Sequence, residues 1–418
     1  MRPTIVISCP IDTYSGYGAR ARDFVQAIVD LDKYDVKVLG QRWGNTRFGY
    51  LADHKRGDLE SLLVPKLDAK PDIWVQITVP NEFQAVGNYN IGVTAGIETT
   101  LCDKSWIEGL NRMDLTLTSS EHSKLDFKET KYELKDNRSG HIQKIELTKP
   151  VEVLFEGVDV NKYFETKSKL DLSSITESFC FLVVGHWLHG SFGNDRKNIG
   201  VTIKSFLETF KNKPNPPALI LKTSYSTTSL SDKSNLIGKI EQIKNTVKGK
   251  LPNIYVLHGD ISDQEMNFLY NHPKVKAMVT HTRGEGFGRP LLEFSMMSKP
   301  IIASGWSGQK DFLNPAHTYL LNGTLTKLDN SSVVKGVLLP ESQWFKVNDN
   351  EAAKAFRLVF KHYKKYITPA KKLKHENKVK FSYQAMVESV KVLLEKYVTN
   401  IKPQPKLSKL SLPKLKKV

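Results

Sequence analysis

The segment KAMVTHTRGEGFGRPLLEFSMMS (276–298) decides the predicted fold. Its apolar start predicts a buried strand and its glycine-rich centre a loop. PLLEFSMMS predicts a helix, with Pro290 in the first turn, where proline is accepted. In open parallel sheets, ligands bind next to the loops that follow the carboxyl ends of the strands. We therefore predict that Glu285 points from the loop into a ligand-binding crevice and that Glu293 lies in the first turns of the helix.

Two successive series of strand and helix patterns surround this segment. The first runs from TIVIS (4–8) to VEVLFEGVDVNKYF (151–164), and the second begins at FCFLVVG (179–185). The strands of the second series are continuous apolar runs, as expected for parallel strands that are covered on both faces. The sequence therefore predicts an α/β protein with two doubly wound, Rossmann-like domains that face a central cleft.

The predicted domains differ in charge. They cover residues 1–160 and 175–380, and are followed by a closing helix (381–400) and a basic, disordered tail (401–418). The 418-residue chain has a net charge of +17, but residues 1–160 hold 20 basic and 24 acidic side chains, a net of −4. The remaining residues hold 41 basic and 20 acidic side chains, a net of +21. This asymmetry predicts contact of the basic C-terminal region with an anionic partner: nucleic acid, a membrane surface or a phosphorylated ligand.

The cysteines and the hydropathy pattern indicate the cellular compartment in which the protein is expected. Cys9, Cys102 and Cys180 are far apart and odd in number, which favours reduced thiols over a disulfide framework or a zinc site. No stretch approaches about 18 consecutive apolar residues, and the first residues lack the pattern of a signal peptide. We expect a cytoplasmic protein, with a peripheral membrane location as an alternative.

Further candidate binding residues precede predicted helices. Arg196 and Lys197 stand before the helix NIGVTIKSFLETF (198–210), where a phosphate would meet helix N–H groups. The backbone N–H groups of Phe287 and Gly288 are left to face a phosphate or sugar oxygen. Paired carboxylates are poor phosphate ligands but good acceptors for sugar hydroxyls. The competing interpretation is a capping glutamate, a glutamate on a helix surface and a solvated basic turn.

Two N-terminal features are less specific. Gly16 and Gly18 would let a loop after the first strand approach a ligand closely, although their spacing differs from the dinucleotide-binding fingerprint. Glu98, in TAGIETT (94–100), is the N-terminal carboxylate predicted to lie nearest an acceptor, with a helix cap or buried salt bridge as the alternative.

The histidines and the one Asp-x-Asp sequence give weak signals. His122 and His281 could line the crevice, although a lone histidine is more often structural. His186 and His189 lack metal-ligand spacing, and Asp30-Leu31-Asp32 is interpreted as a solvated helix end.

Six stretches together resemble retaining nucleotide-sugar glycosyltransferases with the GT-B fold, especially glycosyltransferase family 4. Glu285 and Glu293 match the family's Glu-x7-Glu motif, and the resemblance covers about residues 4–400. The other stretches are SGYGARARDFVQAI (15–28), the region 90–124, VEVLFEGVDVNKYF (151–164), FLVVGHWLHGSFGNDRKNIGVTIKSF (181–206) and KPIIASGWSGQKDFL (299–313).

The resemblance implies roles for the candidate residues. Glu285 would contact hydroxyls of the donor sugar, Glu293 the nucleotide ribose, and Arg196 with Lys197 the diphosphate. No metal or other cofactor is expected, because family 4 enzymes generally need none. Many members carry arginine directly after the strand glycine, whereas His186 follows Gly185 here, so that Arg196 would supply the guanidinium.

The sequence does not identify the acceptor. A glycan, a lipid or a protein hydroxyl is the first hypothesis, and a hydroxymethylated DNA base held through the basic C-terminal region is the second. A third hypothesis comes from another class of function, a non-catalytic two-domain protein that binds sugar. Such a protein would keep the glycines but would not need the Arg-Lys turn. Phosphorylases share the fold, but the chain lacks a recognisable lysine signature for pyridoxal phosphate.

Overall fold

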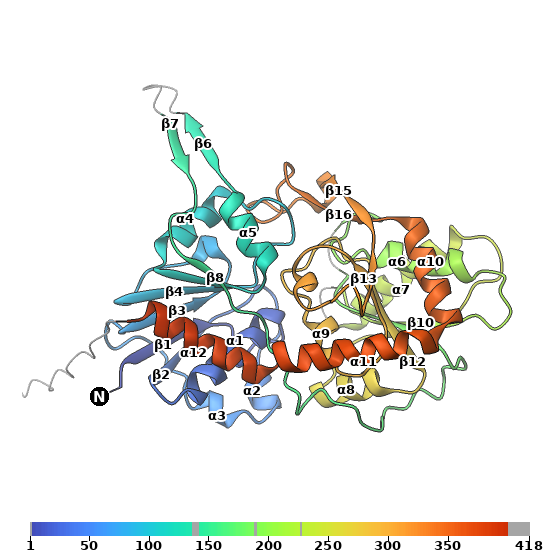
Figure 1. Ribbon diagram of the computed structural model, residues 1–418, viewed down its shortest axis with the longest axis horizontal. Coiled ribbons are helices and arrows are strands. Elements are labelled where there is room, and N and C mark those ends of the chain that lie inside the picture. Colours follow the sequence, from blue (N-terminus) through green and yellow to red (C-terminus); the bar gives the residue numbers. More distant parts are fainter. Residues whose placement is uncertain (1, 136–141, 188–189, 226–227, 400–418) are drawn as a thin grey trace, which may run out of the picture.

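The computed structural model describes residues 2–135, 142–187, 190–225 and 228–399 (Figure 1). The predicted tail (401–418) and His189 lie outside these residues. The chain folds into two halves, each built on a six-stranded sheet with helices on both faces.

The N-terminal sheet has the strand order β2-β1-β3-β4-β5-β8, and all neighbouring strands in it are parallel. Its strands are β1 (Thr4–Cys9), β2 (Asp35–Gly40), β3 (Ile73–Ile77), β4 (Tyr89–Thr94), β5 (Leu115–Thr118) and β8 (Val151–Val153). The helices of this half are α1 (Gly16–Asp30), α2 (Tyr50–Asp53), α3 (Gly57–Glu60), the 3-10 helix η1 (Pro80–Glu82), α4 (Lys104–Arg112) and α5 (Glu121–Glu129).

The C-terminal sheet has the order β11-β10-β9-β12-β13-β14 and is also parallel throughout. Its strands are β9 (Cys180–Val184), β10 (Ala218–Lys222), β11 (Ile254–Leu257), β12 (Val275–Thr280), β13 (Ile301–Ser304) and β14 (Tyr319–Leu321). Its helices are α6 (Ile199–Phe210), α7 (Leu230–Asn245), α8 (Asp263–Asn271), α9 (Arg289–Ser295), α10 (Asp349–Lys361), and the 3-10 helices η2 (Gly308–Asp311) and η3 (Asn330–Ser332). A two-stranded antiparallel ribbon, β15 (Gly323–Lys327) with β16 (Gln343–Val347), follows β14.

Alternate residues of the C-terminal strands enter two separate cores. Phe181 and Leu221 pack against α6 and α10 on one face, whereas Leu182, Ile220 and Met278 pack on the other face with α9. These side chains are at most 1% exposed, as expected for parallel strands covered on both sides. The predicted fold of two doubly wound, Rossmann-like domains is confirmed.

The last two helices connect the halves. Helix α11 (Tyr363–Lys380) runs along the C-terminal half, and α12 (Tyr383–Tyr397) returns to the N-terminal half beside α1 (Figure 1). Met386, Val390 and Leu394 of α12 join the core of β1, β3 and α1. Helix α12 therefore completes the core of the N-terminal domain.

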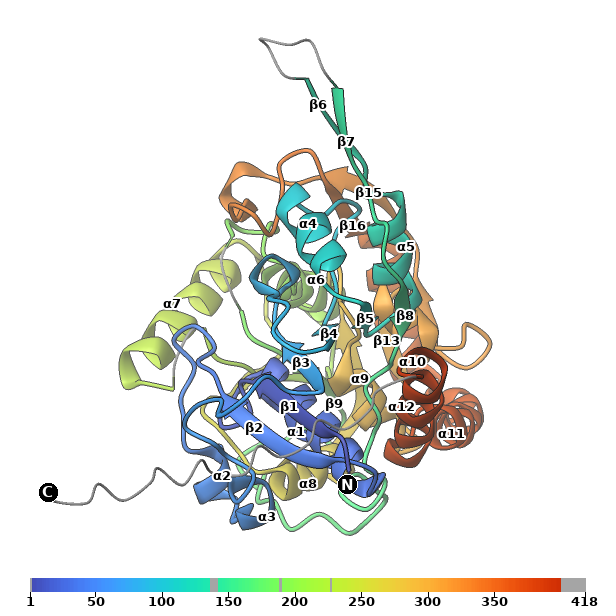
Figure 2. The same cartoon turned by 90° about the vertical axis from the view of Figure 1, so that its left-hand side faces the viewer.

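One local expectation was wrong. Gly16 and Gly18 lie in the first turn of α1, not in a loop, because Ser15 caps the helix by accepting the Gly18 N–H at 2.9 Å. The polar segment after α5 forms a hairpin, β6 (Tyr132–Lys135) with β7 (Ile142–Ile145), which projects from the body in both views (Figure 2).

Candidate functional site

The predicted donor residues lie at the point where the C-terminal strand order reverses. β9 and β12 are neighbours in the sheet, although β10 and β11 lie between them in sequence. The loop after β9 carries Arg196 and Lys197, and the loop after β12 carries Glu285. Ligands of open α/β sheets bind at such a switch point, outside the carboxyl ends of the strands. The structure thus brings together three residues that are up to 89 positions apart.

Glu285 forms a compact charge cluster with the two cations. Lys197 Nζ lies 2.7 and 2.8 Å from the two carboxylate oxygens of Glu285, and Arg196 Nη1 lies 3.2 Å from Oε2. Burial alone would raise the pKa of Glu285, but the charges of Lys197 and Arg196 lower it to about 2. Burial lowers the pKa of Lys197, and Glu285 opposes that shift. Glu285 is therefore ionised at neutral pH and held in one orientation by charge-assisted hydrogen bonds.

The loop that carries Glu285 touches the N-terminal domain directly. A Cβ atom at Gly284 would lie 2.0 Å from the carbonyl oxygen of Glu98, and one at Gly286 would lie 2.1 Å from that of Ala95. Only glycine permits these approaches. Ser119 Oγ also donates to the Gly286 carbonyl at 3.0 Å. The carboxyl-end loops of both sheets meet here.

Glu98, the N-terminal carboxylate predicted to lie nearest an acceptor, lies at this meeting point. Its Oε1 is 3.6 Å from Arg196 Nη1, and the same nitrogen donates to the Gly284 carbonyl at 3.0 Å. Arg196 therefore faces carboxylates from both domains. The alternative role of Glu98, a salt bridge, is present in the structure, and its part in acceptor binding stays a prediction.

The end of the loop is fixed by the segment after β13. Ser307 Oγ accepts the Glu285 N–H at 2.9 Å, and the Gly308 N–H donates to the Glu285 carbonyl at 3.0 Å. Gly288 starts α9 with φ at 99°, a conformation that favours glycine. Phe287 is 3% exposed and packs against Phe312. Phe287 thus anchors the loop through its side chain, and the sugar or phosphate contacts of its N–H group and that of Gly288 stay predictions.

Glu293 lies in α9, as predicted, but both of its oxygens face protein groups. Arg289 Nε donates to Oε1 at 3.0 Å, and the Tyr270 hydroxyl donates to Oε2 at 3.3 Å. Arg289 Nη1 also donates to Asp23 of α1 at 2.5 Å and lies 3.7 Å from Glu156 Oε2. Burial raises the pKa of Glu293 to about 7, although Arg289 opposes the shift. Glu293 therefore belongs to a buried charge network that joins the two domains.

We expect this network to give the protein a distinct dependence on pH. A carboxyl whose pKa is raised on folding stabilises the native state most below its ordinary value of 4.5, and that contribution is lost as the pH rises through about 7. Glu293→Gln cannot titrate, so the difference in unfolding free energy, variant minus wild type, should increase between pH 5 and pH 8 by more than about 1 kcal/mol. Chemical denaturation at both pH values measures it. Glu241→Gln, on the exposed face of α7, is the control, and a constant difference for Glu293→Gln would contradict the raised pKa.

The remaining predicted residues have local structural partners. A Cβ atom at Gly18 would lie 2.3 Å from the Thr13 carbonyl oxygen, so this glycine serves close packing, whereas Gly16 has free space around its Cα. His281 is buried against Phe356, and burial lowers its pKa to about 4. His186 Nδ1 lies 2.8 Å from Ser224 Oγ.

Two further weak signals are explained by a local contact and by a solvated helix end. His122 Nε2 is 3.0 Å from Asp126 Oδ2. Asp32 pairs with the exposed Arg2 at 2.5 Å, in agreement with a solvated helix end.

Sequence reasoning missed the partners of Glu293. Arg289 stands four positions before Glu293, the helical spacing at which ion pairs form, and this signal was available. Asp23 and Glu156 could not have been found, because they come from other elements. Gly284 and Gly286 were visible as alternate glycines around Glu285, but their approach to the N-terminal domain depends on the packing of the two domains.

Among the described residues, His, Cys, Asp and Glu side chains nowhere gather in a group of three or more that could hold a metal ion. Within the same part of the chain, no helix combines the length and the apolar character needed to cross a bilayer.

Comparison with known proteins shows similarity at the level of structure. HepE from Anabaena, solved in complex with UDP and glucose, is 14% identical with a TM-score of 0.61, and the match covers 94% of this chain and 100% of HepE. Sucrose-phosphate synthase from Thermosynechococcus elongatus is 11% identical with a TM-score of 0.61, and covers 95% and 99% of the two chains. A glycosyltransferase from Rickettsia africae is 12% identical, also with a TM-score of 0.61, over 96% and 99%.

In sequence, no family model and no curated protein matches the chain. Each structural match covers nearly the whole length of this chain and of the solved structure. Because the sequence identities are so low, the matches show the fold alone. The chain therefore has the GT-B fold, in which two Rossmann-like domains face each other across their ligand-binding loops.

Proposed function

We propose that the chain is a retaining glycosyltransferase, similar to family 4 enzymes, that moves a hexosyl or related sugar from a nucleotide sugar to a hydroxyl acceptor. The observation that carries the proposal is the cluster of Arg196, Lys197 and Glu285 at the switch point of the C-terminal sheet. A ligand there would meet two cations and one ionised carboxylate. A nucleotide sugar offers the matching groups, a diphosphate and a set of hydroxyls.

The cluster suggests how bond cleavage would be assisted. As the bond between sugar and diphosphate breaks, negative charge grows on the leaving phosphate, and Arg196 and Lys197 are positioned to stabilise it. A diphosphate that shares these cations would release the oxygens of Glu285 to accept sugar hydroxyls. In the retaining reaction, the acceptor attacks on the face that the diphosphate leaves, and the leaving phosphate accepts the acceptor's proton. No protein nucleophile is needed in this scheme.

The contact between domains suggests a closing step. Besides the approach of Gly284 to Glu98, the Thr100 N–H donates to the Gln343 carbonyl at 3.0 Å, and the Glu121 N–H donates to Asp311 Oδ2 at 2.9 Å. We infer that the donor enters when these contacts are open. Closure would then exclude water and favour transfer over hydrolysis.

We also propose a metal-independent reaction, a cytoplasmic location and a position of Glu98 near the acceptor. The reaction would need no metal, because fixed cations take the part that a metal plays in other transferases. A cytoplasmic location agrees with the three free, buried cysteines. Glu98 would lie nearest the acceptor, since it is the N-terminal carboxylate in contact with Arg196.

A glycan, lipid or protein hydroxyl is the acceptor class we favour, because the N-terminal side of the site belongs to an acidic domain. A specific observation supports an anionic acceptor surface as the second candidate. Helix α11 exposes a run of lysines: Lys364, Lys365, Lys371, Lys372, Lys378 and Lys380. Such a helix would suit DNA carrying a hydroxymethylated base, or an anionic membrane.

The proposed function is tested by the thermal stability of the purified chain with nucleoside diphosphates and their sugars. A ligand at 100 times its dissociation constant stabilises the native state by about 2.7 kcal/mol, so at least one uridine, guanosine or adenosine diphosphate should raise the melting temperature. A non-catalytic sugar-binding protein would instead respond to free sugars. No response to any nucleotide in the panel would contradict the proposal.

Deletion of residues 401–418 separates the acceptor classes. The segment holds six lysines and no acidic residue, so its loss should weaken binding to DNA and flatten the salt dependence if the acceptor is nucleic acid. If the acceptor is at a membrane, cosedimentation with anionic vesicles should fall instead. A full-length variant with the six lysines replaced by glutamine distinguishes charge from length. Donor hydrolysis should survive, and unchanged binding to both surfaces would contradict a role for the tail.

A further inference from the structure

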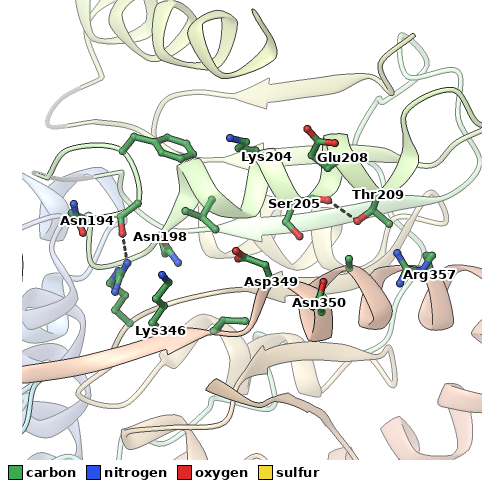
Figure 3. A pocket seen from close by; sticks show the side chains of 16 residues that line it. Asn194, Asn198, Lys204, Ser205, Glu208, Thr209, Lys346, Asp349, Asn350 and Arg357 are labelled. Carbon is green, nitrogen blue, oxygen red and sulfur yellow. Dashed lines mark hydrogen bonds between the residues drawn. The ribbon is translucent and has the colours of Figure 1, made fainter. Parts of the chain in front are cut away.

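A cavity whose lining includes several charged side chains lies between α6 and α10, on the flank of the C-terminal domain (Figure 3). Its volume of about 540 Å³ falls within the range of small-molecule sites, about 300–1,000 Å³. Its walls come from α6, α10, the end of β16 and the loop before α6, with Arg283 from the loop after β12. Glu285 and Lys197 do not line it, so the cavity is separate from the proposed donor site.

Cations predominate in the lining. Lys204, Arg283, Lys346 and Arg357 face two carboxylates, Glu208 and Asp349. Glu208 is already paired with Lys211 at 2.6 Å. Within the described ranges, Lys204, Lys346 and Arg357 form no ion pair at all. The cavity thus offers positive charge that the rest of the described chain does not neutralise.

Three polar atoms on the walls lack hydrogen-bond partners among the described residues. They are Asn198 Oδ1, Ser205 Oγ and Arg283 Nε, and all three are buried. Asn198 is 2% exposed and Arg283 is 5% exposed. Leaving a buried polar group without a partner is costly, and small rotations toward the cavity would let a bound molecule supply one. A ligand that carries hydroxyl groups as well as an anion would satisfy these atoms.

The cavity shares its backbone with the proposed donor site. Asn198 directly follows Lys197, and Arg283 stands two positions before Glu285. The Arg283 N–H donates to the Arg196 carbonyl at 2.8 Å, and the Arg283 side chain donates to the Gly193 carbonyl. A ligand that displaced Arg283 or Asn198 would therefore move the loops that hold the donor cluster.

We propose that this cavity is an effector site for a phosphorylated sugar. The phosphate would lie beside Lys346 and Arg283, whose backbone carbonyl accepts the N–H of the neighbouring Phe345, and the sugar hydroxyls would meet Ser205 and Asn198. Arg357 lies at the opposite end of the cavity from Lys346 and adds positive charge there (Figure 3). Binding itself does not depend on the proposed function, whereas an effect on turnover rests on it. The site is distinct from the nucleotide-sugar site, because neither Lys197 nor Glu285 lines the cavity.

The test is calorimetric titration with glucose 6-phosphate, glucose 1-phosphate and ribose 5-phosphate. At least one should bind, and Lys346→Ala with Arg357→Ala should weaken it tenfold or more. Both side chains are exposed, so the double variant should fold. The control is Lys213→Ala with Lys361→Ala, which removes the same charge from exposed positions of the same domain and should leave binding unchanged.

Three outcomes would overturn the proposal: no binding of any of the three compounds, equal weakening in both double variants, or inorganic phosphate binding as tightly as the sugar phosphates. A saturating nucleoside diphosphate must not displace the sugar phosphate, since displacement would place it in the donor site. Sugar-phosphate binding that persists in a chain unable to bind any nucleotide would refute the proposed function and leave this site standing.

Discussion

Replacement of Glu285 by glutamine should lower the rate of sugar transfer by about 10- to 150-fold, which corresponds to the loss of about 1.5–3 kcal/mol from one charge-assisted interaction. The carboxylate is fixed by Lys197 at 2.7 Å and would orient the donor sugar as positive charge develops on it. Part of this stabilisation arises only in the transition state. Turnover should therefore fall, whereas affinity for the nucleoside diphosphate is kept or increased, because a negative charge beside the phosphates is removed.

Steady-state kinetics and calorimetry on the same preparation give the two quantities. Glu241→Gln, whose carboxylate pairs with Lys244 on the surface of α7, is the matched control and should leave both unchanged. An equal loss of turnover and affinity would assign Glu285 to nucleotide binding, and no loss of either would remove it from the site.

Lys197→Ala should instead weaken binding of the nucleoside diphosphate, again by about 1.5–3 kcal/mol. Lys197 is a partly buried cation next to the N-cap residue of α6, where a phosphate would also meet helix N–H groups. Calorimetric titration of wild type and variant measures the change. Lys211→Ala, at the C-cap of the same helix and far from its N-terminus, is the control.

The variant also leaves Glu285 with one cation fewer, which could lower stability. The double variant Lys197→Ala with Glu285→Gln removes that unbalanced charge and completes a double-mutant cycle. If Lys197 contacts the diphosphate, affinity stays weak in the double variant. Full recovery of affinity would show that Lys197 acts only by neutralising Glu285.

The sequence was sufficient to predict the features that depend on local pattern and on sheet topology. Continuous apolar runs such as FCFLVVG indicate parallel buried strands, and the carboxyl ends of such strands lie on one edge of the sheet. The resemblance to GT-B glycosyltransferases then assigned Arg196, Lys197 and Glu285 to one predicted site before their distances were known. Pro290 likewise marked the first turn of α9.

The features that depend on packing between distant segments could not be predicted. Arg289 donates to Asp23, 266 positions away, and no local pattern reports such a pair. The raised pKa of Glu293 follows from burial in that network, so the sequence could place the residue on its helix but not give its protonation. The start of α1 at Gly16 was missed because the Ser15 cap outweighs the low helix propensity of two glycines.

The central claim, that the chain transfers sugar from a nucleotide sugar through the cluster at Glu285, is tested most directly by proton NMR of the anomeric signals. Uridine, guanosine and adenosine diphosphate sugars are each incubated with wild type and with Glu285→Gln, in the presence of water alone and of a soluble sugar acceptor. We predict that wild type consumes at least one donor, that the first product keeps the donor's anomeric configuration, and that Glu285→Gln slows this reaction about 10- to 150-fold. Consumption of the donor at the same rate by both proteins, an inverted first product, or binding of every donor without any turnover would contradict the account.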